Sequence, residues 1–233
     1  MDIITFFADR PLLIVFIADI IVGSWWLKKF EKQFNLKWPE IILMTILSIA
    51  VAMLSMRALA ILEAGGDLSQ SAFIRLYGAV FTLPILYYVF AKVKQGSVPL
   101  AMDVAAMIAA LGLFCGRINC FKEGCCAGVY FFGSETIRWP IRELELLFYV
   151  VFILFYVKKI SSGKTYGQVY PVFMIAYGIF RFFAEWLREE YTGSIGVIHL
   201  AHIWSLISIA VGTSVYFELK TQRDKKTERR IQK

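Results

Sequence analysis

Seven long apolar segments constrain this chain more than any other feature of its sequence. A helix of about 20 residues crosses the hydrocarbon core of a bilayer, and about 17 residues suffice. The segments that meet or approach this length are Leu12–Leu27, Ile41–Leu62, Ala72–Val93, Leu100–Cys115, Leu144–Val157, Val169–Leu187 and Ile195–Phe217. Because lipid cannot hydrogen-bond to exposed backbone groups, each segment is expected to be helical. The sequence therefore predicts an all-α integral membrane protein with seven transmembrane helices.

The composition agrees with a membrane protein. Hydrophobic residues make up 58% of the 233 residues and charged residues only 18%, too little polar surface for a soluble domain. Many of the basic residues behind the net charge of +7 stand in short connections between apolar runs. This distribution is typical of membrane topology, so the expected partner is the lipid bilayer, and no nucleic-acid partner is expected. No cleavable signal peptide is expected, since the start carries Asp2 and Asp9 and lacks a basic region.

Loop charges orient the predicted helices. Basic residues follow the first, third, fifth and seventh segments: Lys28, Lys29, Lys32 and Lys37, then Lys92 and Lys94, then Lys158, Lys159 and Lys164, then the tail 220–233. The positive-inside rule makes these connections cytoplasmic, so the N-terminus is expected outside the cytoplasmic (inner) membrane and the C-terminus inside. The other connections face outward, although Lys122, Arg138 and Arg142 place positive charge in one of them. We expect a membrane domain over 1–219 and a basic cytoplasmic tail over 220–233.

Four arginines are expected near the outer ends of four helices. Arg57 and Arg181 each precede the outer end of their segment by about six residues, or roughly 9 Å of helix, and Arg75 and Arg117 lie at segment ends. Two more charged residues share the helix face of Arg181, at i+4 and i+7: Glu185 and Arg188. Arginine keeps its charge and offers a fork of donors suited to phosphate. The pattern predicts an outer-leaflet anion site for a phospholipid headgroup. Snorkelling to the headgroups is the alternative, and it is favoured for Arg75 taken alone.

All four cysteines lie in one stretch, Cys115-Gly-Arg-Ile-Asn-Cys-Phe-Lys-Glu-Gly-Cys-Cys-Ala-Gly128. Its glycines permit tight turns and a close approach of the backbone to a headgroup. Four roles stay open for the cysteines: a disulfide or redox pair between Cys120 and Cys125 or Cys126, small apolar fillers, a catalytic thiol, or a zinc site. Zinc is the weakest, because no separate second ligand pair is present.

Other polar residues in the apolar segments receive structural interpretations. His199 and His202 stand at i, i+3 without a nearby carboxylate, which favours packing over metal binding, so no metal and no cofactor are predicted. Asp103, near the cytoplasmic start of its helix, is expected to cap a helix or to pair with Lys94. Asp19 lies in the middle of the first segment, and the sequence does not indicate its partner.

Four motifs resemble those of the bacterial phosphatidylglycerol–prolipoprotein diacylglyceryl transferase family. Met56-Arg-Ala58 is similar to the arginine-bearing element of its second helix. Gly116-Arg-Ile-Asn-Cys-Phe121 through Gly128 resembles its signature Gly-Arg-x-Gly-Asn-Phe-x-Asn-x-Glu-x-x-Gly. Pro140-Ile-Arg-Glu-Leu-Glu145 more loosely resembles its Pro-x-Gln-Leu-Tyr-Glu element. Tyr177-Gly-Ile-Phe-Arg-Phe-Phe-Ala-Glu-Trp-Leu-Arg188 is the most specific match, to its sixth-helix motif.

The resemblance implies a transfer of diacylglyceryl from phosphatidylglycerol to the cysteine thiol of a lipoprotein precursor, or of a related acceptor, at the outer membrane face. A thioether forms and glycerol phosphate leaves, an anion that convergent arginines would stabilise. The implied partners are phosphatidylglycerol or a similar anionic phospholipid and a lipoprotein precursor peptide. Arg117 and Arg181 match the family's essential arginines, with Glu185 positioning Arg181. The implied substrate-binding residues are Arg57, Arg75, Cys120, Cys125, Gly128, Glu145 and Arg188.

The chain also departs from the family pattern. Leu76-Tyr77-Gly78-Ala79 stands where the family has a His-Gly-Gly element, so Tyr77 takes the catalytic place of the histidine proposed to activate the thiol. An unperturbed tyrosine has a pKa of about 10, against about 6.5 for histidine, and is a poorer base at neutral pH unless arginines lower its pKa. Cys120 and Cys125 replace an Asn and a Glu of the signature. The alternative is therefore a phospholipid-binding or accessory membrane protein that keeps the phosphate pocket but lacks the histidine.

Overall fold

The structure is a computed structural model that describes residues 11–69, 75–124, 126–132, 134, 136–161, 167–189, 194–195 and 198–231. Within these ranges the chain forms seven long helices and one short helix. They are α2 (Pro11–Lys28), α3 (Glu31–Phe34), α4 (Trp38–Glu63), α5 (Tyr77–Val93), α6 (Val98–Glu123), α7 (Ile141–Ser161), α8 (Val169–Trp186) and α9 (Leu200–Ile231). A two-stranded antiparallel hairpin, β1 (Ser194–Ile195) and β2 (Ile198–His199), precedes α9.

The seven long helices match the seven predicted segments, and the bounds differ where local chemistry overrides hydropathy. Helix α6 continues past Cys115 and ends at Glu123. It ends there because the next residue, Gly124 (φ 67°), adopts the left-handed conformation that terminates helices. The last helix was expected from Ile195, which is wrong, since Ile195 pairs with Ile198 in the hairpin and α9 begins at Leu200. Helix α5 begins at Tyr77, and the predicted start at Ala72 lies outside the described residues.

Three helices are long and apolar enough to cross a membrane by length and composition alone. They are Trp38–Glu63, Val98–Ile118 and Leu200–Gln222, with mean hydropathy of 2.1, 2.0 and 1.5. Apolar side chains on their outer faces are exposed, as expected where lipid is the solvent; Leu54 is 69% exposed and Leu62 is 72% exposed. The described part of the chain is thus mostly helical, with membrane-spanning character.

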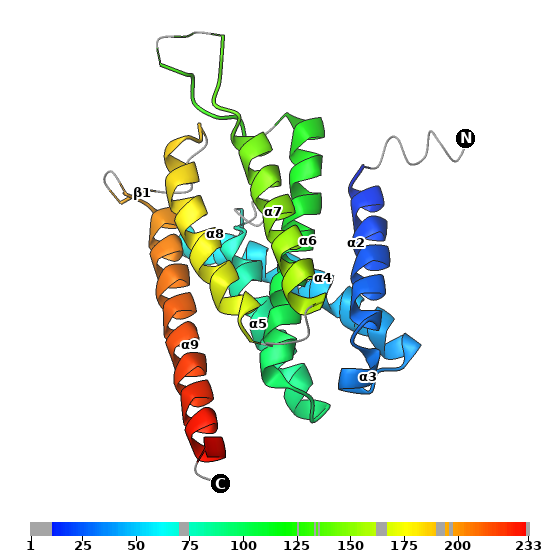
Figure 1. Ribbon diagram of the computed structural model, residues 1–233. Coiled ribbons are helices and arrows are strands. Elements are labelled where there is room, and N and C mark those ends of the chain that lie inside the picture. The colour runs from blue at the N-terminus through cyan, green and yellow to red at the C-terminus, as the bar shows by residue number, and fades with distance from the viewer. Residues whose placement is uncertain are drawn as a thin grey trace, which may run out of the picture.

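Helices α6, α7, α8 and α9 run in alternating directions, which sorts their connections to two ends of the molecule (Figure 1). One end carries the α6–α7 connection, β1 and the start of α2. The other carries α3 and the C-terminus, where α9 continues without a break across residue 220 to Ile231. The described ends of α2, α5, α7 and α9, each followed in the sequence by basic residues, lie toward the α3 end.

Helices α8 and α9 pack closely through two glycines. A Cβ at Gly178 of α8 would lie 2.8 Å from the Ser205 carbonyl oxygen. A Cβ at Gly212 of α9 would lie 2.9 Å from the Pro171 carbonyl oxygen. Small residues at such positions let two membrane helices approach to backbone contact. This contact fixes the start of α9 beside the end of α8.

Asp103 fixes the other end of α8. This fully buried carboxylate on α6 accepts hydrogen bonds from the backbone N–H groups of Gly167 (2.5 Å), Val169 (2.9 Å) and Tyr170 (2.9 Å). These are donors that the first turn of a helix cannot satisfy internally. The expected capping role of Asp103 is confirmed, with α8 as the capped helix. Lys94, the other expected partner, contacts Glu40 at 2.5 Å.

Candidate functional site

Five charged side chains from three helices meet in the interior, near the α6–α7 connection. Arg117 lies in the last turns of α6, Glu145 in the second turn of α7, and Arg181 and Glu185 in the last two turns of α8. Arg188 follows directly after α8. None of them is more than 6% exposed, and Glu145 and Glu185 are fully buried. Charged residues are almost never buried to this degree unless they are paired.

Two carboxylates hold the three guanidinium groups together. Glu145 Oε1 accepts from Arg117 Nη2 and from Arg181 Nη1, each at 2.9 Å, and its Oε2 contacts Arg117 Nε. Arg181 Nη2 then reaches Glu185 Oε2 at 2.8 Å. Arg188 Nη1 is 3.9 Å from the same oxygen. Glu145 therefore links α6 to α8, and Arg188 is the most loosely held of the three arginines.

The cluster has one more positive than negative group among its arginines and glutamates. Arg188 carries the least satisfied of these charges, since its buried Nε has no hydrogen-bond partner within the described residues. Burial lowers the pKa of Arg188, and the neighbouring charges of Arg181 and Arg117 lower it further. An arginine in this setting gains from a nearby anion, because the anion offsets both effects. The cluster is suited to bind a phosphate or another oxyanion.

Two cysteines border the cluster. Arg117 Nη1 donates to Cys120 Sγ at 3.7 Å, and the Cys126 thiol is in hydrogen-bond contact with both Cys120 and Arg117. The pKa of Cys126 lies well below its usual range, first because Cys120 hydrogen-bonds to it and then because Arg188 and Arg117 are close. Within the described residues neither Cys120 nor Cys126 forms a disulfide. Cys125, the other predicted member, lies outside the described residues.

The segment after Cys126 is fastened to the end of α8. The Val129 N–H donates to the Leu187 carbonyl at 2.9 Å, and the Glu189 N–H donates to the Ala127 carbonyl at 3.1 Å. Between these bonds Gly128 pairs with Arg188 as an isolated β-bridge. A Cβ at Gly128 would lie 2.2 Å from the Trp139 carbonyl oxygen. Gly128 was predicted to bind substrate, and in the structure its backbone packs closely against the backbone of Trp139.

Tyr77, the predicted counterpart of the family histidine, is buried near the cluster. Its hydroxyl lies 2.7 Å from Ser205 Oγ, and its ring packs on Tyr177 with centroids 5.3 Å apart. Ser205 donates its only hydroxyl proton to the Ala201 carbonyl at 2.7 Å. The Tyr77 hydroxyl is therefore the donor to Ser205. Ser205 is a contact that sequence reasoning did not indicate, because it stands 128 positions from Tyr77.

The other two predicted arginines lie apart from the cluster. Arg75 Nε contacts Glu63 Oε2 at 2.6 Å, and Trp204 donates to Glu63 Oε1 at 2.7 Å, which ties together α4, α9 and the residues before α5. Arg57 is exposed on α4. The structure thus brings together Arg117 and Arg181, and adds the third arginine from the tail of the same motif.

The remaining polar predictions resolve into packing contacts. His202 is 1% exposed, accepts from the His199 backbone N–H at 3.1 Å, and packs against Trp186 with ring centroids 5.0 Å apart. These contacts confirm the packing interpretation for His202. Asp19 finds its partner in the side chain of Cys115. Within the described ranges no group of three or more His, Cys, Asp or Glu side chains is placed to hold a metal ion.

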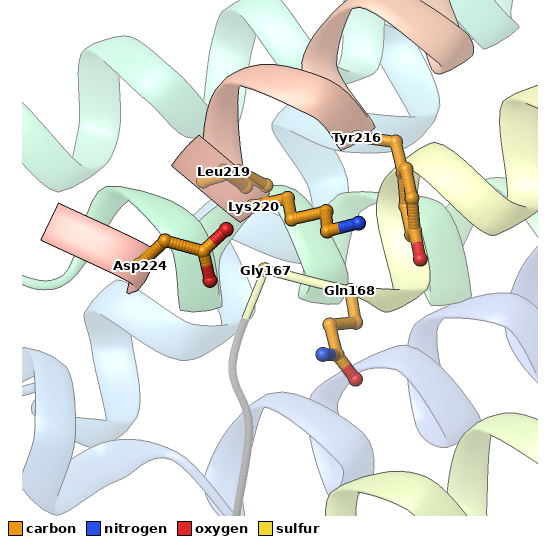
Figure 2. Close-up of a pocket in the computed structure, with 6 residues that line it drawn as sticks. All are labelled: Gly167, Gln168, Tyr216, Leu219, Lys220 and Asp224. Atoms are coloured by element: carbon orange, nitrogen blue, oxygen red, sulfur yellow. The ribbon is translucent and has the colours of Figure 1, made fainter. Parts of the chain in front are cut away.

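A separate pocket of about 230 Å³ lies at the α3 end of the molecule, between the residues that lead into α8 and the stretch 216–224 of α9 (Figure 2). It is lined by Gly167, Gln168, Tyr216, Leu219, Lys220 and Asp224. The arginine cluster is at the opposite end of α8 and shares no residue with it. The pocket is therefore no part of the candidate site.

The comparison with known families covers most of the chain. The family model described as "Prolipoprotein diacylglyceryl transferase" matches residues 13–217, which include all seven long helices in whole or in part. The chain belongs to the prolipoprotein diacylglyceryl transferase family. All five cluster residues fall inside the match.

Individual members of the prolipoprotein diacylglyceryl transferase family are distant relatives. The phosphatidylglycerol–prolipoprotein diacylglyceryl transferase of Clostridium tetani is 29% identical over 60% of this chain and 62% of its own length. That of Finegoldia magna is 30% identical over 66% of this chain and 64% of its own, and that of Ehrlichia canis is 33% identical over 48% and 49%. The chain thus spans about half to just under two thirds of the length of these curated relatives.

Proposed function

We propose that this protein transfers a diacylglyceryl group from phosphatidylglycerol to a cysteine thiol of a lipoprotein precursor or a related acceptor. The thiol loses its proton, and the sulfur forms a bond to the glyceryl carbon as the bond from that carbon to the phosphate oxygen breaks, with the proton balancing the charge on the departing phosphate. Glycerol phosphate leaves, and the product is a thioether. Family membership supports this reaction class, and the buried cluster of Arg117, Arg181 and Arg188 is the observation that carries it.

Within the proposed reaction, Arg188 is the principal phosphate ligand. Its Nε lacks a partner in the described structure, whereas Arg117 and Arg181 are each held by carboxylates at 2.9 Å or less. Arg117 and Arg181 act beside it by stabilising the charge that develops as glycerol phosphate leaves, and Glu185 positions Arg181. Preorganised donors of this kind stabilise a transition state because they need no rearrangement when charge appears.

The proposed orientation places the cluster at the outer face of the cytoplasmic membrane. We propose seven spans with the N-terminus outside and the C-terminus cytoplasmic. The ends of α2, α5, α7 and α9, each followed in the sequence by basic residues, lie toward the α3 end, and the arginine cluster lies at the other end of α8. The positive-inside rule then puts the cluster outside, where a phospholipid headgroup and a lipoprotein precursor would meet it.

The experiment compares Arg188→Gln with Lys92→Gln in vesicles that contain phosphatidylglycerol and a cysteine peptide. We expect Arg188→Gln to lower the release of glycerol phosphate by roughly 10²–10³-fold, as for the loss of one transition-state donor. Lys92, exposed at the α3 end, is the matched loss of one positive charge and should leave the rate unchanged. Equal rates for the two variants would contradict the assigned role of Arg188.

A second candidate function is phospholipid binding without transfer. The observation that favours it is the Tyr77 hydroxyl, which donates to Ser205 and so is not placed as a proton acceptor. In that case wild-type protein would bind phosphatidylglycerol through the arginines and release no glycerol phosphate with any thiol. Measuring binding and release on the same vesicles separates the two functions.

A further inference from the structure

The thiols of Cys120 and Cys126 lie beside two guanidinium groups of the arginine cluster, those of Arg117 and Arg188. Cys120 is in the last turn of α6 and accepts from Arg117 Nη1 at 3.7 Å. Cys126 lies three residues beyond the end of that helix, in hydrogen-bond contact with Cys120 and Arg117 and close to Arg188. Both side chains are only partly buried and so are partly exposed to solvent.

The surrounding structure imposes the position of Cys126. The residue has φ 59°, in the left-handed region that side chains other than glycine seldom adopt. The backbone on its C-terminal side is held by the two hydrogen bonds to the end of α8, from Val129 and to Ala127. Unfavourable backbone conformations of this kind persist only where neighbouring contacts determine them. The thiol is thereby kept beside Cys120.

The electrostatic setting favours a reactive sulfur at Cys126. The ionisable groups that face it are Cys120 and Arg117 from α6 and Arg188 from the end of α8. The Cys120 hydrogen bond and the two positive charges lower the pKa of Cys126, which keeps its thiolate populated at neutral pH. A thiolate that is accessible and adjacent to a second thiol has the properties of peroxide-reactive cysteines.

We propose that Cys126 and Cys120 form a peroxide-reactive thiol pair that closes an intramolecular disulfide next to Arg117. The Cys126 thiolate takes an oxygen atom from a hydroperoxide to give a sulfenic acid, and hydroxide leaves when the oxidant is hydrogen peroxide. The Cys120 thiol then forms the S–S bond, and the sulfenic oxygen leaves as water. The peroxide is reduced by two electrons, and the two sulfurs are oxidised by one electron each.

This modification is distinct from lipid transfer, and only its consequence for the site rests on the proposed function. The cluster contains two carboxylates, and the Cys126 thiolate is a third negative group beside it. The disulfide removes this negative charge. A phosphate then no longer competes with the thiolate for Arg117 and Arg188. The thiol experiments below contain no lipid substrate, so they fail or succeed independently of the transferase assay.

The first experiment measures alkylation on the full chain in detergent at pH 7, with Cys125→Ser as the background so that peptides are assigned without ambiguity. Iodoacetamide is expected to modify Cys126 at least about tenfold faster than Cys115, since an ordinary thiol is only a few per cent ionised at this pH. Arg188→Gln removes one facing charge, so it should raise the pH at which the alkylation rate of Cys126 reaches half its maximum. An unchanged midpoint in Arg188→Gln would overturn the electrostatic account.

The second experiment counts thiols after treatment with hydrogen peroxide and denaturation in excess alkylating agent. On the Cys125→Ser background three thiols should fall to one, with Cys120 and Cys126 recovered in one disulfide-linked pair of peptides. Cys115→Ser, the matched control on the same helix, should still lose two thiols. Cys120→Ser should form no disulfide, and its Cys126 should be labelled by dimedone as a sulfenic acid.

Three outcomes would overturn the proposal: no loss of thiols, a disulfide that includes Cys115, or a disulfide only between separate chains. Should the Cys125→Ser background not fold, the unmodified chain gives the same test, because its four thiols must fall to two. In that chain a bond from Cys120 to Cys125, with Cys126 left free, also refutes the assignment.

Discussion

Replacing Glu145 by glutamine removes the carboxylate that joins Arg117 to Arg181 while keeping the shape of the side chain. Glu145 is fully buried and accepts from both guanidinium groups at 2.9 Å. The three arginines of the cluster would then share Glu185 alone. Removing one partner of a buried ion pair costs about 3–5 kcal/mol, since the remaining charge stays buried without compensation. We expect a loss of folding stability in this range.

The measurement is unfolding in mixed micelles with increasing denaturant, followed by tryptophan fluorescence. The matched control is Glu143→Gln, the same chemical change two residues earlier on α7 at an exposed position. Exposed substitutions away from such contacts usually change stability by less than about 0.5 kcal/mol. The difference between the two variants therefore isolates the burial of the carboxylate from the change in net charge.

An added anion should restore part of the loss in Glu145→Gln. Glycerol phosphate bound at the uncompensated arginines stabilises the folded state by up to about 2.7 kcal/mol at a concentration of 100 Kd. We expect the gain to be larger in the variant than in the wild type. If Glu145→Gln is no less stable than Glu143→Gln, or if the anion does not help it, the cluster is not organised around Glu145 in the way described.

Three further substitutions test separate parts of the structure. Asp103→Asn weakens three bonds at the start of α8 and should cost about 1–3 kcal/mol in the same unfolding assay, and an unchanged stability would contradict the capping role. Tyr77→Phe removes the hydroxyl that donates to Ser205. A large fall in transfer rate with little change in stability would support the predicted base, whereas a loss of about 1 kcal/mol with the rate kept would assign Tyr77 to packing. Cys126→Ser removes a thiolate near Arg188 and should lower the inhibition constant for glycerol phosphate, and a higher constant would refute that competition.

Helical periodicity in the sequence predicted the contacts of the site that lie within one helix. The i, i+4 spacing of Arg181 and Glu185 predicted a shared face, and the two side chains form an ion pair at 2.8 Å. Arg188 was placed on that face as well, and it reaches the same carboxylate at 3.9 Å. Such contacts follow from helical geometry and need no knowledge of how helices pack.

Contacts between helices were beyond that reasoning. Glu145 stands 28 positions from Arg117 and 36 from Arg181, and no local pattern indicates that α7 delivers it to both. The sequence predicted that Arg57 and Arg75 lie at a depth in the membrane similar to that of the other arginines. Depth alone does not fix the direction in which a side chain points from its helix. The rotation of each helix about its own axis is decided by packing, and α4 turns Arg57 outward.

Helix ends were also set by features that hydropathy does not report. The polar last turns of α6 stay helical until Gly124, and the residues before α9 form a hairpin because Ile195 and Ile198 pair across it. Both differences lie at the α6–α7 end of the molecule. The extension of α6 moves Cys120 from a loop to a helix end, and this brings its side chain to Arg117.

The distribution of the cluster over α6, α7 and α8 has a consequence for biosynthesis. Emerging helices enter the bilayer in order, and a charge that lies within a span without its partner is costly. Arg117 on α6 pairs with Glu145, which enters the membrane later with α7. Glu145 also pairs with Arg181, which enters later still with α8. We therefore expect these helices to leave the insertion machinery as a group rather than singly. Chains truncated after α7 should be held at the translocon or degraded, and chains truncated after α8 should be released into the membrane.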